Sequence, residues 1–259
     1  MKVSTLISDQ SGTIRKPRTP GERKTVLLIG GPGSVLGSRL VQKLSEQFEV
    51  ATTWFSSPPN SFTDAEHVHP YQLDVADAAA VDALLREVHE DLGDVDILIN
   101  NAGVFLGHAL PMTPLKDWQH VLNVNLTGVF NCCKAVARKM MQRRTGKIIN
   151  IASIKGLIGG EGESAYAASK AGVIALSKSL ARELAPYNVT VNVVCPGYIK
   201  SELNKFDARL ESIEQERGLL DIGNNLDDAV NLINFLCGEN LKSVTGQVFH
   251  ADSRIHCDI

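Results

Sequence analysis

A tyrosine and a lysine stand four residues apart in the segment YAASK. On a helix this spacing places Tyr166 and Lys170 on one face, so that an ammonium group lies beside a phenol. A nearby cation favours the phenolate, and we expect it to lower the pKa of the tyrosine from about 10 toward neutrality. Tyr166 is therefore a candidate general acid or base for proton transfer between an alcohol and a ketone, and Ser153 can hydrogen-bond the same carbonyl oxygen. The tyrosine and lysine alone are also typical of a solvated helix surface.

Apolar segments of strand length alternate with helix-length segments from Thr25 onward. The predicted strands are residues 26–29, 48–54, 68–73, 95–99, 147–151, 189–194 and 247–250. The predicted helices are residues 38–47, 76–92, 115–144, 165–184 and 227–237. This alternation predicts an α/β fold, a single-domain Rossmann-type doubly wound parallel sheet of about seven strands flanked by helices. In such sheets ligands bind beyond the carboxyl ends of the strands.

The composition narrows the class of protein. A chain of 259 residues with 44% apolar residues can bury one large core, and residues 25–259 are predicted to form it. Residues 1–24 are polar and contain Pro17 and Pro20, which predicts a flexible N-terminal arm. The net charge of −3 argues against nucleic-acid and membrane partners. Five cysteines without C-x-x-C pairs, scattered histidines and the lack of a long apolar run predict a cytoplasmic protein with reduced thiols and no metal.

The first predicted strand runs directly into the glycine-rich segment GGPGSVLG. A strand, such a turn and a helix together are typical of a cradle for a dinucleotide pyrophosphate. The spacing G-x-G-x-x-G fails here, however, because Gly31 and Gly33 are followed by Leu36 where the third glycine would stand.

Taken together, these motifs resemble the short-chain dehydrogenase/reductase family, and most of all its 3-oxoacyl-[acyl-carrier-protein] reductases, from about Lys24 to the end of the chain. Each motif alone is a weak signal, but their order is specific, and Ser153 stands the expected thirteen residues before Tyr166. The matching pieces are the turn at 30–37, Asp74, N-N-A-G at 100–103, Asn125, Ser153, Y-A-A-S-K at 166–170 and P-G at 196–197.

The resemblance implies an NAD(P)H-dependent oxidoreductase that reduces a ketone, such as a 3-oxoacyl thioester, to a secondary alcohol. Tyr166 would donate the proton, Lys170 would lower its pKa and Ser153 would orient the carbonyl. Asn125 would hold a water that extends a proton relay from Lys170. The implied cofactor contacts are Gly31, Gly33, Ser34, Leu36, Gly37, Ser56, Asp74, Asn101, Ala102, Gly103, Tyr166, Lys170, Pro196 and Gly197. Asp74 would contact the adenine amine, although it can also cap the helix that follows.

Of the three glycines in the family pattern T-G-x-x-x-G-x-G, Gly31 and Gly37 are kept, and Val35 replaces the middle one. A missing side chain there lets the backbone approach the pyrophosphate, and a β-branched residue does not readily take a positive φ. We therefore expect Val35 to affect cofactor binding. Near the C-terminus Ser253 and Arg254 replace two family glycines, which predicts an altered subunit-contact turn.

The choice of cofactor depends on the end of the second strand, near Trp54. No acid lies between residues 50 and 63 to bind the ribose hydroxyls of NAD. No lysine or arginine lies between Lys43 and Arg86, but Ser34, Ser56 and Ser57 can hydrogen-bond a phosphate and Arg39 is near. NADPH is favoured, and NADH is not excluded.

Two segments, residues 156–164 and 201–218, are predicted to shape the substrate pocket, the second as a lid, with Glu161 and Glu163 on the surface. The basic run 138–147 has two interpretations, cations at a helix C-terminus or a docking site for an acyl carrier protein through Arg144. The second basic contact expected of such a site falls on Tyr187.

Two other functions stay open. The same groups would serve a dehydrogenase oxidising a polyol, steroid or secondary-metabolite alcohol, or the fold could be kept by a nucleotide-sensing scaffold that is not an enzyme. By resemblance we expect a homotetramer that assembles through helices 115–144 and 165–184.

Overall fold

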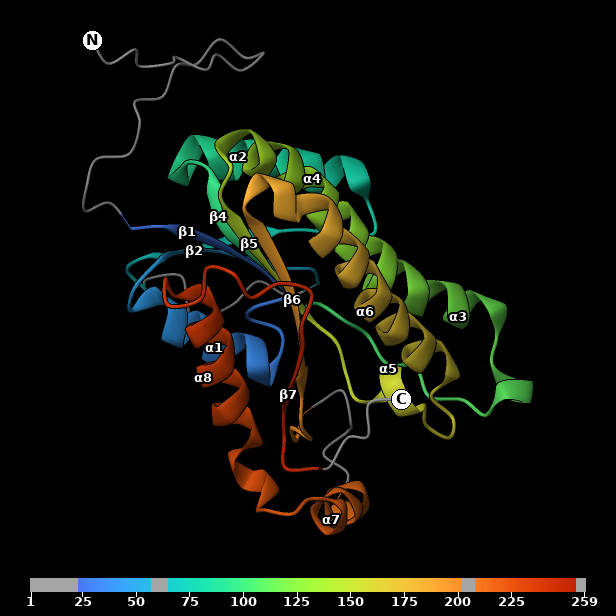
Figure 1. Ribbon diagram of the computed structural model, residues 1–259. Helices are drawn as coiled ribbons and strands as arrows, with labels where there is room; N and C mark the ends of the chain where they lie inside the picture. Colours follow the sequence, from blue (N-terminus) through green and yellow to red (C-terminus); the bar gives the residue numbers. More distant parts are fainter. Residues whose placement is uncertain (1–22, 57–64, 202–207, 255–259) are drawn as a thin grey trace, which may run out of the picture.

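The computed structural model describes residues 23–56, 65–201 and 208–254. Its seven-stranded sheet has the order β3-β2-β1-β4-β5-β6-β7, and all neighbouring strands are parallel (Figure 1). The strands are β1 Thr25–Ile29, β2 Glu49–Trp54, β3 Val68–Gln72, β4 Val95–Asn100, β5 Gly146–Ile151, β6 Val189–Pro196 and β7 Val248–Ala251. The predicted fold class is confirmed.

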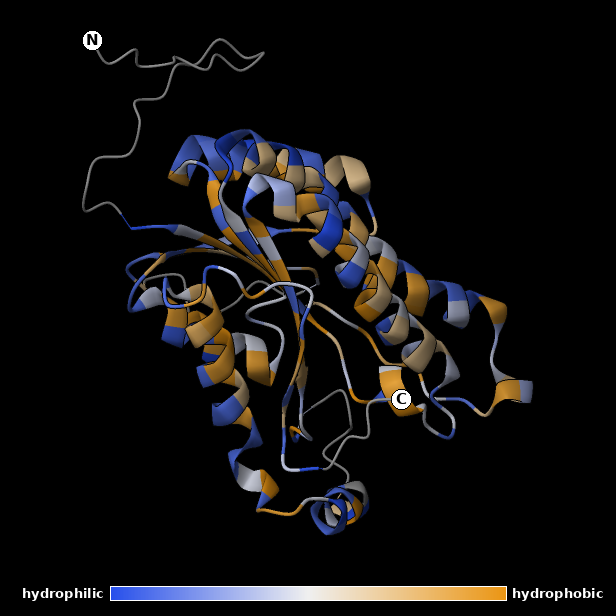
Figure 2. Cartoon of the chain, viewed as in Figure 1, coloured by the Kyte–Doolittle hydropathy of each residue, from blue (hydrophilic) through white to orange (hydrophobic). Residues whose placement is uncertain are grey.

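Helices cover both faces of this sheet. They are α1 Val35–Ser45, α2 Ala78–Leu92, α3 Leu115–Leu122, α4 Gly128–Arg143, α5 Lys155–Ile158, α6 Ser164–Leu184, α7 Ala208–Arg217 and α8 Asn225–Cys237. Side chains from α2, α4 and α6 form one buried core with the sheet, and those from α1 and α8 form another. The central strands are almost wholly hydrophobic, because both of their faces are covered by helices (Figure 2).

The expected elements differ from the observed ones in three places. The long helix predicted for residues 115–144 is interrupted by a π-helical turn, Asn123–Thr127, between α3 and α4. Both predicted substrate segments contain a helix that was not expected, α5 in the first and α7 in the second. The helix after the glycine-rich turn begins at Val35, earlier than predicted, because Ser34 caps its first turn.

The predicted arm, residues 1–24, lies outside the described residues except for its last two. Those two pack on the domain, since the Arg23 guanidinium donates a hydrogen bond to the Ser45 carbonyl at 2.8 Å and Lys24 pairs with Glu239. The described part of the domain thus begins directly before β1.

Parallel pairing brings the carboxyl ends of all seven strands to one edge of the sheet. The glycine-rich turn follows β1, Ser56 follows β2 and Asp74 follows β3. Asn101 follows β4, and Ser153 follows β5. The segments singled out from the sequence therefore share one edge, as the topology requires.

Candidate active site

The three side chains of the predicted proton-transfer group meet at the carboxyl end of β5. Tyr166 and Lys170 both lie on α6, and the Lys170 Nζ is 5.7 Å from the centroid of the Tyr166 ring. Lys170 is buried and donates a hydrogen bond to the Ile151 carbonyl at 2.8 Å, which ties α6 to the end of β5. Ser153, two residues beyond Ile151, hydrogen-bonds the Tyr166 side chain. A carbonyl oxygen placed at Tyr166 can thus contact two hydroxyl groups.

Burial is the largest cause of the pKa shifts of Tyr166 and Lys170. It raises the pKa of Tyr166 to about 12, although the hydrogen bond from Ser153 acts in the opposite direction, and the carboxylate of Glu163 raises it further. Burial lowers the pKa of Lys170 to about 8. The expectation that the lysine brings the tyrosine pKa toward neutrality is therefore wrong for the protein alone, because the cost of burying a phenolate is larger. At neutral pH the tyrosine keeps its proton and the lysine is cationic.

Asn125 occupies the π-helical turn and is completely buried. Its amide donates to the Val104 carbonyl at 2.9 Å and to the Ser169 hydroxyl at 3.1 Å, and its oxygen accepts from the Val104 amide at 2.8 Å. Both donor hydrogens of the side chain are therefore used within the protein. Asn125 fixes the loop after β4 against α6 at Ser169, the residue directly before Lys170.

Several neighbours of the tyrosine were missed by sequence reasoning. The Phe105 ring meets the Tyr166 ring edge-on, with 5.4 Å between centroids. Glu163 is half-buried, not on the surface as expected, and lies 3.4 Å from the ammonium of Lys155. Glu161 is exposed, as expected. The Lys155–Glu163 pair was visible in the sequence only as two opposite charges between Ser153 and Tyr166, a weak signal.

The glycine-rich turn is built for close packing of backbone. Gly30 has a φ of +78°, and a Cβ added to it would lie 2.6 Å from the Ala102 Cα, so the turn rests on the loop after β4. A Cβ added to Gly37 would lie 2.2 Å from the Gly31 carbonyl oxygen, which only a glycine at this position of α1 avoids. Gly33 has no atom within 4 Å of an added Cβ, and it leaves space beside the N-terminus of α1.

Two polar side chains hold this turn in place. The Ser34 hydroxyl accepts a hydrogen bond from the Gly37 amide at 3.0 Å and one from Asn101 at 3.2 Å. Asn101 also donates to the Gly30 carbonyl at 2.6 Å. Amide groups at the N-terminus of a helix, beside a turn with open space, fit a pyrophosphate. The residues present therefore suit a dinucleotide.

The other predicted cofactor contacts differ in their exposure to solvent. Leu36 is buried in the core, so only its backbone can face a cofactor. The carboxylate of Asp74 is exposed and accepts a hydrogen bond from the Ala76 amide at 2.9 Å, whereas Asp77 caps α2. Ser56 is exposed beyond β2.

Three further predicted contacts are Gly103, Pro196 and Gly197. Gly103 lies beside Lys170, because an added Cβ would be 3.6 Å from the Lys170 Nζ. Pro196 ends β6, and Gly197 follows it with its amide bonded to the Ala251 carbonyl at 3.0 Å. Of the three, Gly103 is the one that lies next to Lys170.

The arrangement matches a known family. A family model described as short chain dehydrogenase matches residues 24–211. The chain belongs to the short chain dehydrogenase family. It is an NAD(P)-dependent oxidoreductase of that family. Among the residues that the structure describes, no helix is long and apolar enough to cross a membrane.

Named relatives within the short chain dehydrogenases agree with this assignment. The 3-oxoacyl-[acyl-carrier-protein] reductase FabG of Staphylococcus aureus is 34% identical over 244 residues, covering 90% of this chain and 98% of that protein. The FabG of Escherichia coli is 37% identical over 190 residues, covering 71% and 76% respectively. A solved structure described as ElxO with NADP bound has a TM-score of 0.80 and 30% identity, covering 89% of this chain and 98% of that one.

Val35, which replaces a glycine of the short chain dehydrogenase pattern, disturbs the backbone of the turn less than expected. Val35 is the first residue of α1, and none of the positive φ angles in the described residues belongs to it. The valine therefore needs no unusual backbone. What distinguishes it from the family glycine is the side chain that it adds beside the N-terminus of α1.

The cation expected near the cofactor phosphate is engaged elsewhere. The Arg39 guanidinium lies 2.7 Å from the carboxylate of Asp227 on α8, and both side chains are largely exposed. Exposed ion pairs of this kind are weak and can exchange partners. Arg39 thus links α1 to α8 and remains at the surface near the turn.

Proposed function

We propose that this protein reduces a ketone to a secondary alcohol with NADPH, and that Ser153, Tyr166 and Lys170 carry the proton transfer. The single observation that supports the proposal most is the junction of β5 and α6, where the hydroxyls of Ser153 and Tyr166 and the ammonium of Lys170 lie close together. Relatives that are named 3-oxoacyl-[acyl-carrier-protein] reductases support a 3-oxoacyl thioester as substrate.

In this mechanism the substrate oxygen accepts hydrogen bonds from Ser153 and Tyr166. The bound nicotinamide supplies hydride chemistry, and Gly31, Ser34 and the other contacts predicted above would hold the dinucleotide. As the carbonyl carbon is reduced, the Tyr166 hydroxyl gives its proton to the oxygen, and the phenolate that remains is stabilised by the Lys170 ammonium. Proton return to the tyrosine through a water at Asn125 is part of the proposal, although both amide hydrogens of that side chain already have partners.

The protonation states favour the reductive direction at neutral pH. A phenol whose pKa is about 12 is ready to donate a proton, whereas alcohol oxidation requires the phenolate. A dehydrogenase acting on an alcohol is the second candidate, and this observation makes it less suited to neutral conditions. The third, a nucleotide-sensing scaffold, is disfavoured because every member of the proton-transfer group is present.

Oxidation of NADPH with acetoacetyl thioesters and a panel of ketones tests the proposal. Tyr166→Phe is expected to lower kcat by about 10²–10⁴-fold, since that is the usual contribution of a general acid. Tyr187→Phe, the same change in the turn that follows α6, is the control and should leave kcat unaltered. If Tyr166→Phe reduced the ketones as fast as the native protein, the proposed role of the tyrosine would be wrong, and a biological activity unaffected by it would favour the scaffold.

NADPH is the cofactor that we propose, because the end of β2 carries no acidic side chain for the ribose hydroxyls. Fluorescence titration with NADPH and NADH distinguishes the two. Tighter binding of NADH would overturn the preference without affecting the reaction class.

Docking of an acyl carrier protein has weaker support. The Arg144 guanidinium donates a hydrogen bond to the Pro186 carbonyl at 2.7 Å and lies over the Tyr187 ring, 5.9 Å from its centroid. The residue that would serve as the second basic contact therefore packs under the first. We propose that a free or coenzyme-bound thioester suffices as substrate, and comparison of acetoacetyl coenzyme A with the carrier-bound form tests this.

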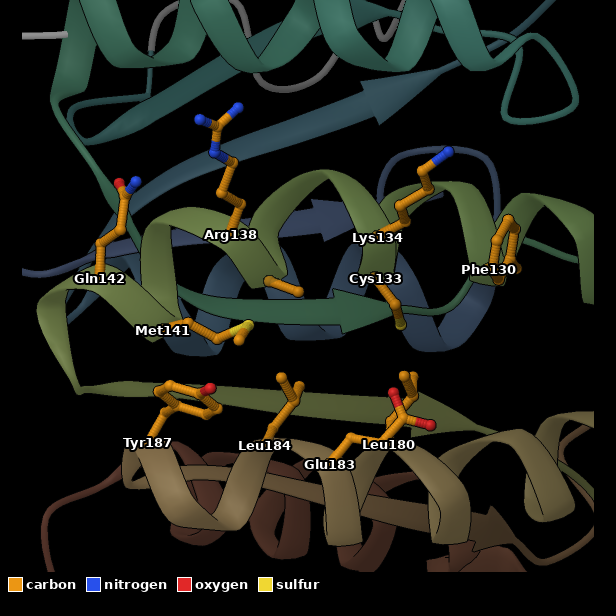
Figure 3. A pocket seen from close by; sticks show the side chains of 11 residues that line it. Phe130, Cys133, Lys134, Arg138, Met141, Gln142, Leu180, Glu183, Leu184 and Tyr187 are labelled. Carbon is orange, nitrogen blue, oxygen red and sulfur yellow. The ribbon is translucent and has the colours of Figure 1, made fainter.

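The described chain also carries a groove suited to self-association. It has a volume of about 530 Å³ and lies between α4 and α6, with Phe130 and Met141 on one wall and Leu180 and Tyr187 on the other (Figure 3). Apolar side chains line an open surface there, which is typical of an interface. We propose that the homotetramer assembles through this groove.

A further inference from the structure

The helix α7 is attached to the domain by charge. Its sequence, ARLESIEQER, has no apolar stripe, and among its described side chains only Glu214 is buried. A carboxylate 4% exposed needs partners of opposite charge. One of its partners lies on another segment, so the position of α7 depends on that contact.

Arg254, beyond β7, is the main partner. Its Nη1 lies 2.7 Å from a Glu214 carboxylate oxygen, and its Nε donates a hydrogen bond to Asp252 at 2.6 Å. Arg254 and Asp252 are themselves nearly buried, with side chains 14% and 4% exposed. The second Glu214 oxygen lies 3.1 Å from Arg217, which is more than half exposed. A planar guanidinium that bridges two carboxylates fixes both in orientation.

The other end of this network reaches the edge of the sheet where the candidate active site lies. A Cβ added to Gly197 would be 2.7 Å from the Asp252 Cβ, so Asp252 packs directly on the segment after β6. The Leu220 amide, just after α7, donates to the Ser253 hydroxyl at 3.0 Å and makes a second connection. Figure 1 shows α7 beyond the end of the sheet, near the lower end of β7.

We infer that Arg254 is a positioning residue that holds α7 over the substrate side of the active site. The inference deepens the proposed function and rests on it for the identity of the site. It replaces the expectation that Ser253 and Arg254 only alter a subunit contact, because both side chains bond to the segment 214–220 of the same chain. Removing Arg254 leaves the carboxylate of Glu214 buried with one exposed cation, and α7 loosens.

The test compares Arg254→Gln with Glu211→Gln. Glu211 lies on the same helix and makes an exposed ion pair with Lys200 at 2.7 Å, so its loss should have little effect. Hydrogen–deuterium exchange of the α7 amides is expected to speed up on the order of tenfold in Arg254→Gln and to change less than twofold in Glu211→Gln. With an acetoacetyl thioester as the probe, KM should rise on the order of tenfold while kcat changes less than about threefold.

Arg254→Lys keeps the charge without the planar fork and should show an intermediate effect on both measurements, which secures the test if Arg254→Gln does not fold. Equal exchange in the two glutamine variants would overturn the inference, and so would faster exchange with an unchanged KM. Exchange is measured without turnover, so the attachment of α7 is tested even if the native protein reduces no ketone.

Discussion

At the scale of single residues, burial shifts the pKa values of Tyr166 and Lys170 and so decides which of the two is protonated at a given pH. The pKa of Lys170 is lowered to about 8 by burial, so its ammonium is present below that pH and lost above it. The phenolate formed at Tyr166 during reduction needs this cation. We expect kcat for ketone reduction to be level below about pH 8 and to fall up to about tenfold per pH unit above it.

Rate profiles between about pH 6 and 10 check this expectation. In Lys170→Arg the cation persists throughout this range, since an arginine stays charged. The variant should be slower but should lack the alkaline decline. If kcat of Lys170→Arg fell at alkaline pH as in the native protein, the fall would be caused by the titration of another group.

Substitutions at two glycines of the turn test two different roles, the close packing of the backbone at Gly37 and the binding of the cofactor at Gly33. Gly37→Ala places a Cβ against two backbone carbonyl oxygens, at 2.2 Å from Gly31 and 2.5 Å from Gly30, so the backbone has to move. We expect a loss of about 1–3 kcal/mol of folding free energy. Gly33→Ala meets no atom within 4 Å and should leave Tm unchanged while weakening NADPH binding about tenfold, since the open space is where a pyrophosphate would lie.

Thermal unfolding and fluorescence titration of both variants check this contrast. Unchanged NADPH affinity in Gly33→Ala would place the pyrophosphate elsewhere. Unchanged stability in Gly37→Ala would mean that the turn relaxes at little cost.

At the scale of secondary-structure elements, the π-helical turn depends on one buried amide. Asn125→Ala removes three hydrogen bonds and leaves the backbone amide and carbonyl of Val104 without them. Each buried group left unpaired costs about 1–3 kcal/mol, so we expect a clear fall in Tm and a loss of reductase activity.

Asn131→Ala is the matched control on α4. Asn131 is also buried, but it makes one bond, to the Val75 carbonyl at 3.0 Å, and not to a residue of the proposed proton-transfer group. It should lower Tm less and leave kcat unaltered. Equal loss of activity in the two variants would show that Asn125 acts only through stability.

The elements divide into those that sequence periodicity reveals and those that it does not. β1, β4 and β5 were predictable because they are buried apolar runs, and α2 because Val81, Leu84 and Val88 recur on one face. α7 was not predictable, because its one buried described side chain is Glu214, which pairs with a residue 40 positions away. A long-range ion pair leaves no local pattern.

The same limit applies to the candidate site. The order of motifs predicted Ser153 at the end of a strand and Tyr166 and Lys170 on the helix that follows, and the structure brings these three together. The direction of the Tyr166 pKa shift was predicted wrongly, since it depends on how deeply the phenol is packed. The environment of Glu163 was missed for the same reason.

At the scale of the whole molecule, the groove between α4 and α6 should decide the assembly. Phe130 is 45% exposed at its rim, which is unfavourable for an aromatic side chain in water. In a two-fold interface each residue near the axis occurs twice, so a charge introduced there meets its own copy. Phe130→Glu should therefore convert the expected tetramer to a smaller species, whereas Phe130→Leu, which keeps an apolar side chain, should retain it.

Size-exclusion chromatography with light scattering measures these masses. The Glu variant should also keep its far-UV circular dichroism, because an exposed side chain contributes little to the fold. Since Phe130 is exposed in the groove and is not part of the proposed proton-transfer group, a smaller species that still reduces ketones would show that each subunit carries a complete site. A Glu variant with the native mass would mean that the chain assembles through another surface or not at all.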